Sequence, residues 1–427
     1  MQEYPIINKK MVRLNRSLKT NQKEYKRNYD TGSRRMPGNV TGKLVRLYRE
    51  EPVKDNKESV TYCTKGPDAM EMIAMTEQQG LKGMSGNGFP VAKKLQTFLK
   101  ARKGKGILIV NAMECDPGLL HDEWILKNKE AEVWMGIDYL KQAFGFERII
   151  IAVKMKSRSA RKSKENDTFR RRKRRVRAKG EKIEGSESVS ESTVCNAFKN
   201  EMPYAAEKTR RDMLAALKHE VQGRYPMGEE HFLIKELLGV SMNPDDIPAR
   251  RGILVMNVQT VFQIGRMVNG LDTKGHYVTL ANLMTGEAKV AYVMPEERII
   301  PLLKAVYPGY GTYYAGHGVL AAHKVSEEET FCDTIGFAAI GGETGISDQN
   351  LCKKCGACAR KCPMGISVKN IVLARQDDRN ADVSKFHPEL CMHCGSCTFY
   401  CHASKNVEKI VGEGGSNNEG GKFGRKS

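Results

Sequence analysis

Apolar positions along the first third of the chain follow two different periods, and these alternate. The segments 66–79, 93–101 and 121–145 space their apolar residues three and four apart, which predicts helices. By contrast, 105–112 and 147–153 are short, nearly continuous apolar runs, which predict buried strands. Alternating strands and helices favour a parallel sheet covered by helices, so this part predicts an α/β domain with Rossmann-like layering.

The pattern resumes further along and then changes. Helices are predicted over 204–221 and 231–239, with the loop 223–230 between them, and 251–268 predicts a strand that runs into a helix. The stretch 276–306 predicts two strands about a glycine turn followed by a helix. This second pattern indicates a small separate unit of β-grasp type at 273–330.

Three segments lack the apolar residues needed for a core. The first, 1–60, is basic and predicts an extended arm, and the second, 154–191, is a basic run followed by a Ser/Glu run, which predicts a disordered insertion. The third, 406–427, is rich in Gly, Ser and Lys and predicts a disordered tail. The α/β domain would then cover 61–272 with the insertion inside it.

The net charge of +20 is concentrated in two places. Residues 1–60 hold 15 Lys/Arg against 7 Asp/Glu, and residues 154–182 hold 15 against 3, which accounts for the whole excess. Nucleic-acid binding through the second run is an alternative function, but the run lacks interleaved aromatic residues and a solvated insertion has the same charge. Nucleic acid is therefore not the expected partner. The basic segments could instead attract an acidic redox partner.

The chain shows no export or membrane signal. No apolar run approaches the ~18–20 residues of a membrane span, and the N-terminus has no apolar core of signal-peptide length. We therefore expect a cytoplasmic protein with no transmembrane segment, either free or peripheral to a membrane complex. Twelve cysteines in a reducing compartment favour metal ligation over disulfides.

Eight of these cysteines form two runs with the same spacing, C-x2-C-x2-C-x3-C. This is the bacterial ferredoxin pattern, in which the fourth cysteine of each run binds the other cluster. The spacing predicts two 4Fe-4S clusters in a helical domain at 345–405. The ligands of one would be Cys352, Cys355, Cys358 and Cys401, and those of the other Cys391, Cys394, Cys397 and Cys362. Structural zinc is the alternative, but zinc knuckles leave no third cysteine at this spacing.

A glycine-rich loop at 80–95, "GLKGMSGNGFPVAKKL", lies between two predicted helices. That setting differs from the strand-turn-helix of a Rossmann fingerprint. Glycines still let the backbone approach a flat ring or a phosphate closely, and a helix that begins at 91 would point its amides and Lys94 toward an anion. An ordinary turn between helices is the alternative.

Four motifs occur in order before the cysteine runs: "GLKGMSGNGFP", "VNAMECDPG", "YPMGEE" and "MNVQTV". Together they resemble the RnfC family of flavin and iron-sulfur electron-transfer subunits and, more distantly, the FMN-carrying, NADH-oxidising component of complex I. The resemblance covers about 65–153 and 215–405. Family members that work with proline reductase look closest. For 273–330 the resemblance implies the family's SLBB module.

The resemblance implies a set of cofactor-binding residues. Those expected at FMN are the loop residues Gly83, Gly86, Gly88 and Phe89, the phosphate-facing Lys94, and Asn111, Asn257 and Thr260. Those expected near the flavin and the dinucleotide are Glu114, Asp116, Tyr225, Gly228, Glu229 and Glu230. Each has a structural alternative: Glu229 and Glu230 could cap the helix after them, Asn257 could be a turn residue, and Phe89 could belong to the core.

The implied function is electron transfer from NADH through FMN and two 4Fe-4S clusters to a partner protein, which is a reductase complex or a set of Rnf-type subunits. FMN would take a hydride, and the clusters would pass single electrons; this chemistry needs no acid/base dyad, and the sequence shows none. Ser85, Asn87 and Met113 depart from the family pattern beside the flavin. A flavin-free iron-sulfur relay between partners is therefore the alternative.

Overall fold

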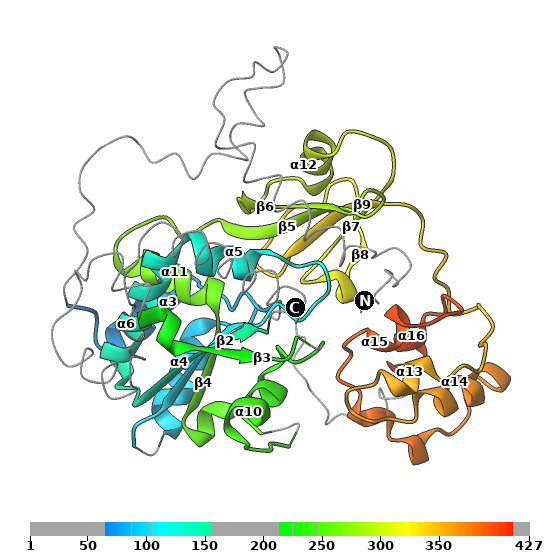
Figure 1. The fold of residues 1–427 in the computed structure, drawn as a ribbon, viewed down its shortest axis with the longest axis horizontal. Coiled ribbons are helices and arrows are strands. Elements are labelled where there is room, and N and C mark those ends of the chain that lie inside the picture. The colour runs from blue at the N-terminus through cyan, green and yellow to red at the C-terminus, as the bar shows by residue number, and fades with distance from the viewer. Residues whose placement is uncertain are drawn as a thin grey trace, which may run out of the picture.

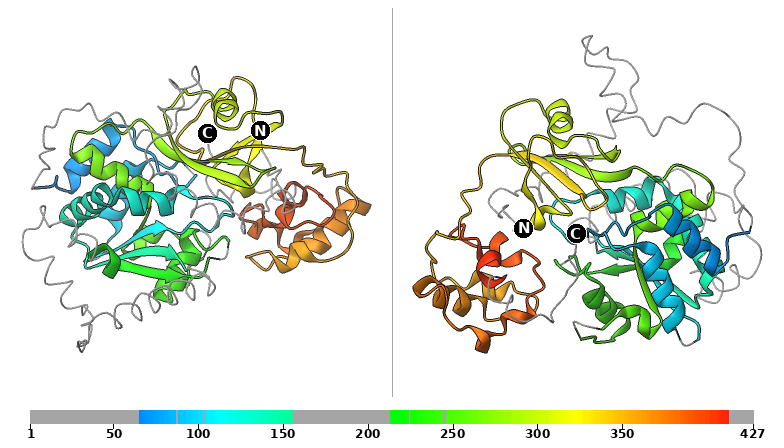
Figure 2. Two further views of the ribbon diagram at one scale, coloured as in Figure 1. Left: turned by 45° about the horizontal axis from the view of Figure 1, so that its top comes forward. Right: turned by 180° about the vertical axis from the view of Figure 1, so that it is seen from behind.

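The structure is a computed structural model that describes residues 65–86, 88–102, 104–155, 213–223, 225–243 and 246–412. The expected arm at 1–60, almost all of the insertion 154–191, Asn87 and the chain beyond 412 lie outside these residues. Figures 1 and 2 show three parts: an α/β part, a second sheet, and a cysteine-rich part.

The α/β part is built on four parallel strands in the order β3-β2-β1-β4. The strands are β1 (Ile107–Ala112), β2 (Arg148–Lys154), β3 (Lys218–Val221) and β4 (Ile253–Asn257). The apolar runs at 105–112 and 147–153 thus form adjacent parallel strands, and the prediction of a parallel sheet is confirmed.

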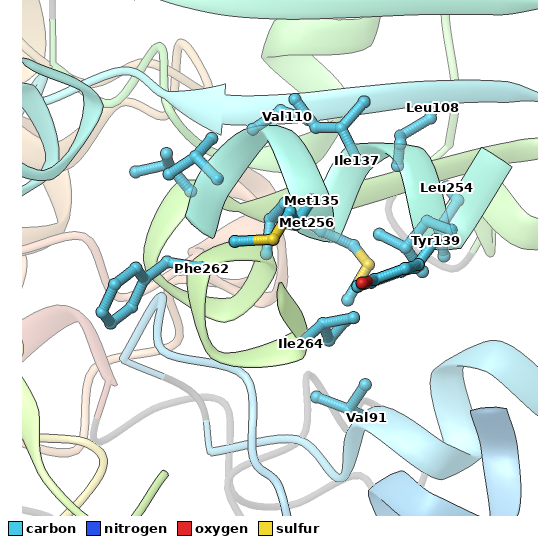
Figure 3. Close-up of a cluster of buried hydrophobic side chains, with 14 of the residues drawn as sticks. Val91, Leu108, Val110, Met135, Ile137, Tyr139, Leu254, Met256, Phe262 and Ile264 are labelled. Atoms are coloured by element: carbon cyan, nitrogen blue, oxygen red, sulfur yellow. The ribbon is translucent and has the colours of Figure 1, made fainter. Parts of the chain in front are cut away.

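Helices cover both faces of this sheet. On one face, Leu108 and Val110 of β1 pack into the main core with side chains of five helices: α3 (Ala69–Gln78), α4 (Val91–Ala101), α5 (His121–Asn128), α6 (Glu130–Phe144) and α11 (Val258–Val268). Figure 3 shows part of this core. On the other face, Ile109 packs with Leu233 and Ile234 of α10 (Glu230–Leu238). Strands β1, β2 and β4 therefore have nearly continuous apolar runs because both of their faces are buried, whereas the edge strand β3 is largely exposed.

Helices α6 and α11 cross at two glycines. A Cβ built on Gly136 would lie 2.0 Å from the carbonyl oxygen of Val261, and one on Gly265 would lie 2.1 Å from that of Glu132. Both neighbours are helix backbone and cannot turn away as a side chain could. The glycines therefore set how closely the two helices approach.

The second sheet is mixed, with the order β6-β5-β9-β7-β8. Its strands are β5 (His276–Asn282), β6 (Glu287–Val293), β7 (Thr312–Gly316), β8 (His323–Lys324) and β9 (Phe337–Gly341). Strands β5 and β9 are parallel and the other pairs antiparallel. Helix α12 (Ile299–Val306) packs on one face, and the short helix η2 (Val319–Ala321) follows β7.

Buried glutamines of α11 join the two sheets. The Gln259 side chain accepts a hydrogen bond from the Tyr277 amide (2.6 Å) and donates one to the Tyr277 carbonyl (3.2 Å). Gln263 donates to the Gly275 carbonyl at 2.6 Å. These bonds satisfy backbone groups at the start of β5 that would otherwise be buried without partners.

The cysteine-rich part repeats one backbone pattern at an interval of 39 residues. Gly356 and Gly395 both have positive φ, 70° and 73°, and precede the short helices α13 (Ala357–Arg360) and α15 (Ser396–Phe399). Longer helices follow at the same interval, α14 (Val368–Asp377) and α16 (Val407–Gly412). Their apolar residues form a small core of their own with Cys358 and Cys397.

The structure differs from the sequence predictions at three places. Residues 218–221, expected as the end of a helix, form β3, because they pair with β2 at the edge of the sheet. The second sheet takes in β9 and so extends beyond the expected limit at 330. The tail was expected from 406, but Val407, Ile410 and Val411 of α16 are buried.

We expect Gly136→Ala to destabilise the protein. The added Cβ would force α6 away from α11, and overpacking of this kind costs about 1–3 kcal/mol, so the thermal unfolding midpoint should fall by several degrees. Gly342→Ala is the control, because nothing lies within 4 Å of a Cβ there. Equal midpoints for the two variants would show that the crossing is not tightly packed.

Candidate functional site

The carboxyl ends of β1 and β4 bring two of the predicted residues together. Asn111 and Asn257 lie opposite one another in the parallel register. The Asn111 side chain donates to the carbonyl of Gly228 at 2.8 Å and accepts from the amide of Met113 at 3.0 Å. Asn257 caps α11 through the amide of Gln259 at 2.8 Å. Ligands in α/β proteins bind at this edge of the sheet.

The glycine loop lies against the same edge. The amide of Met84 donates to the Oγ1 of Thr260, in the first turn of α11, at 3.0 Å. Gly86 has φ of +96°, and a Cβ on it would lie 2.4 Å from His317; Gly88 has φ of +58° and faces Thr334. Only glycine suits both positions. The loop is thus a closely packed backbone cradle, with the first turns of α4 and α11 beside it.

Phe89 ends the loop with its ring half in solvent. Its exposed fraction is 51%, so the alternative assignment of Phe89 to the core is wrong. Its carbonyl accepts from the amide of Gly83 at 2.9 Å, which closes the loop. An aromatic face is therefore available beside the cradle.

Two buried carboxyl groups lie behind Asn257. The Nδ2 of Asn257 donates to Asp122 Oδ2 at 2.9 Å, and the Asp122 amide donates to Glu114 Oε1 at 2.8 Å. Burial raises the pKa of Asp122 to about 7 and raises that of Glu114 as well, the latter with a contribution from the charge of Asp122. These groups can therefore hold a proton near neutral pH, next to the cradle.

Lys94 and Glu230 form an ion pair across the cradle. The amine expected to face a phosphate thus has a carboxylate partner in this structure. Glu229 caps α10, accepting from the amides of His231 (3.0 Å) and Phe232 (3.3 Å). The capping alternative is therefore confirmed for Glu229, whereas Glu230 lies inside the helix.

Asp116 and Tyr225 join the three parts through hydrogen bonds. The Asp116 carboxylate accepts from the amides of Val319 (3.0 Å) and Leu320 (3.4 Å), after β7. The Tyr225 hydroxyl donates to the carbonyl of Cys394 at 2.8 Å. One apolar cluster fills the space between them, formed by Leu119, Tyr225, Tyr314, Val319, Leu320, Phe399 and Tyr400, among others.

Met113, the departure from the family pattern expected beside the flavin, is buried in the core under α10. Its side chain packs with Ile109 and Leu233, on the opposite face of the sheet from the main core. Met113 therefore does not argue against a bound flavin. Ser85 is exposed at the tip of the loop.

The eight cysteines surround two cavities, and the fourth cysteine of each run belongs to the other run's cavity. The first cavity is lined by Cys352, Cys355, Cys358 and Cys401. The second is lined by Cys391, Cys394, Cys397 and Cys362. This is the crossed grouping that the sequence spacing predicts.

The donor chemistry of these cavities fits a cluster of several iron atoms. Within the described residues, no three His, Cys, Asp or Glu side chains converge on one ion, as a structural zinc site requires. Burial raises the pKa of Cys358 to about 11 and that of Cys391 to about 12. Positive charge beside these thiols would keep them ionised, and a bound cluster would supply it.

The two cavities differ in the buried charge that lines them. Lys405 lines the first; its Nζ donates to the carbonyls of Asp348 (2.6 Å) and Asn350 (2.7 Å). Glu408 lines the second, with Oε1 at 2.7 Å from His393 Nδ1 and Oε2 buried without a partner in the described chain. Glu408 lines the cavity and the His393 imidazole does not.

Several residues at these sites were not predicted from the sequence: Asp122, His317, Lys405 and Glu408. Asp122 follows the "ECDPG" motif in the first turn of a helix, and His317 lies between two glycines. Neither signal is specific. Their positions depend on which elements pack together.

Comparison with known proteins adds three similarities. The family model described as the Nuo51 FMN-binding domain matches residues 76–266. The C component of the ion-translocating oxidoreductase complex of Vibrio cholerae is 24% identical over 308 residues, which are 69% of this chain and 33% of that protein. The C component of the Na(+)-translocating ferredoxin:NAD(+) oxidoreductase complex of Acetobacterium woodii is 23% identical over 321 residues, 73% of this chain and 62% of that protein.

The chain spans less than two thirds of either relative. Among solved structures, an NAD+-reducing [NiFe]-hydrogenase in the H2-reduced state matches with a TM-score of 0.52 and 15% identity, over 87% of this chain and 68% of the other. This similarity concerns the fold. Among the helices of the described residues, none combines the length and the apolar character of a membrane span.

We expect the pH dependence of stability to report on the pair of His231 and Glu229. The hydrogen bond from Glu229 raises the pKa of His231 to about 9. The imidazolium therefore stabilises the fold fully below about pH 6.5, and this contribution is lost as the pH rises from 6.5 to 9. His231→Gln should make the unfolding midpoint depend less on pH over this range. His219→Gln, at an exposed position, should leave the pH dependence of the midpoint unchanged. An unaltered slope in the first variant would contradict the assignment.

Proposed function

Because the chain belongs to the RnfC family of flavin and iron-sulfur electron-transfer subunits, we propose that it passes electrons from NADH through FMN and two 4Fe-4S clusters to a partner protein. The observation that carries the proposal is the crossed grouping of the eight cysteines about two cavities. Two independent four-cysteine sites would have no reason to exchange their fourth ligands. Two adjacent ferredoxin-type clusters require it.

The residues at the cradle fit FMN. Gly83, Gly86 and Gly88 keep the loop free of side chains, so that its backbone could lie against a flat ring while positions 86 and 88 pack on His317 and Thr334. Asn111, Asn257 and Thr260 place polar groups at the adjoining strand ends. Lys94 would face the phosphate if its pairing with Glu230 gave way. Bound FMN would supply hydride acceptance and single-electron release.

The chain's own contribution is to position the dinucleotide and to hold protons. The half-exposed ring of Phe89 offers an aromatic face for stacking beside the cradle. Glu114 and Asp122, buried behind Asn257, can hold a proton near the flavin. The segment 225–230 borders the cradle, since the Gly228 carbonyl accepts from Asn111 and Glu230 pairs with Lys94. Two of its residues, Tyr225 and Glu229, are already engaged in structural bonds.

The remaining parts complete the proposed path. The second sheet would be the family's SLBB module of β-grasp type, and the repeated cysteine-rich part a ferredoxin-like two-cluster domain. The acceptor would be a reductase complex, such as the proline reductase served by PrdC, or a set of Rnf-type subunits. The protein would be cytoplasmic or peripheral to a membrane complex.

We expect protein purified without oxygen to contain about eight irons and one FMN per chain, and its visible absorbance to bleach on addition of NADH. Gly86→Val should abolish the flavin and leave the iron, because the side chain would collide with His317. Eight irons without flavin in the unaltered protein would instead favour the flavin-free relay. Protein without iron would refute both.

Cysteine replacements should group by cavity and not by run. Cys401→Ser and Cys355→Ser should perturb the same cluster in EPR spectra of the reduced protein, and Cys362→Ser and Cys394→Ser the other. The exposed Cys332→Ser is the control, and its spectrum should be unchanged. If Cys401→Ser resembled Cys394→Ser, the crossed assignment would be wrong.

A further inference from the structure

The two cysteine runs share one backbone but not one surface. Each run carries a non-glycine residue with positive φ at the same place, Lys354 (55°) and His393 (52°). At three other pairs of equivalent positions the two runs carry side chains of different chemistry. Where the first run has Lys353, Arg360 and Lys361, the second has Met392, Phe399 and Tyr400.

The second run's surface is covered by the rest of the chain. Phe399 is buried in the apolar cluster with Tyr314 and Leu320, and Tyr400 packs against the same cluster. The Cys394 carbonyl accepts the hydrogen bond of Tyr225. The second cavity therefore lies on the side of the α/β part that carries the cradle.

The first run's surface is open. Its ligand Cys355 is exposed, and so are Lys353, Lys354, Arg360 and Lys361 beside it. Leu351, directly before the first cysteine, is 74% exposed. Between 349 and 376 the sequence has six Lys or Arg and no Asp or Glu, and in the described part of the chain the four named cations form no ion pair. Lys361 borders the covered surface, since its Nζ lies 5.0 Å from the ring centroid of Tyr400. We call the surface of Leu351, Lys353, Lys354, Arg360 and Lys361 the basic face.

We propose that the basic face is the docking site of a small acidic electron-carrier protein that exchanges electrons with the first cluster. The inference deepens the proposed function and rests on its two clusters. A positive surface on a segment without Asp or Glu attracts an acidic partner and speeds its encounter, and an exposed leucine beside the cations gives a contact that excludes water. One electron leaves the first cluster and one enters the carrier's redox centre, and no atom or proton is transferred.

The buried charges support the same order of groups. Lys405 at the first cavity would favour the more negative, reduced form of a cluster there, whereas the second cavity is lined by Glu408, whose carboxylate is bonded to His393. Electrons that enter on the flavin side would then pass downhill to the open side.

The test compares two variants of equal charge. One is Lys353→Glu with Lys354→Glu on the basic face. The other is Lys100→Glu with Lys105→Glu, two exposed lysines near the amino end of β1, at the opposite edge of the sheet from the cradle. The probes are an acidic bacterial ferredoxin and an acidic flavodoxin. Affinity is measured by calorimetry over a range of salt, and electron exchange by stopped flow after chemical reduction of the clusters, so that neither readout depends on FMN or NADH.

We expect at least one probe to bind with an affinity that falls with salt, and the basic-face variant to weaken binding and slow the exchange about tenfold or more. The control variant should change either by less than about twofold. Equal effects in both variants, or no binding of either probe, would overturn the proposal. Iron analysis of each preparation shows whether the clusters are present, and so distinguishes failure of the docking proposal from failure of the proposed function. If charge reversal prevents cluster assembly, the Lys353→Gln, Lys354→Gln variant replaces the Glu variant in the same comparison.

Discussion

The junction of the three parts is the constraint on which the arrangement depends. Asp116 holds the backbone at 319–320, Tyr225 holds that at 394, and one apolar cluster lies between these bonds. The two bonds reach different parts of the chain. Asp116 lies in the loop after β1 and Tyr225 in the loop after β3, so both belong to the same edge of the first sheet. The cradle and the second cavity therefore keep a fixed relation, which a path of redox groups requires and a flexible linker could not provide.

Local patterns predicted much of this fold, because they are local in origin. A strand buried on both faces must be apolar along its length, as 107–112 is, and ligand spacing must suit a cluster. Where the outcome depended on distant pairing, prediction failed. Residues 218–221 contain good helix formers, yet they pair with β2 across the insertion. Strand β9 lies in the middle of the second sheet, where it pairs with β5 from far earlier in the sequence.

The candidate site shows the same division. The glycines at 86 and 88 could be expected from sequence to take positions that favour glycine, and both have positive φ and close neighbours; their role as a flavin cradle stays a prediction. The neighbours of each side chain could not be predicted from the sequence. Met113 turns into the core below α10, Lys94 meets Glu230 from 136 residues away, and Phe89 is left half exposed. Only packing decides such orientations, and the same short motif can serve a ligand, a helix cap or a domain contact.

The repeated cysteine pattern shows how a symmetric frame acquires a direction. Two runs with the same φ angles would by themselves make two equivalent sites. The difference lies in what surrounds them. Aromatic residues pack one run against the rest of the chain, whereas the other run carries exposed cations. Lys405 lines one cavity, and Glu408, bonded to His393, lines the other. Because the ligands are alike, it is these neighbours that can make one site an entrance for electrons and the other an exit.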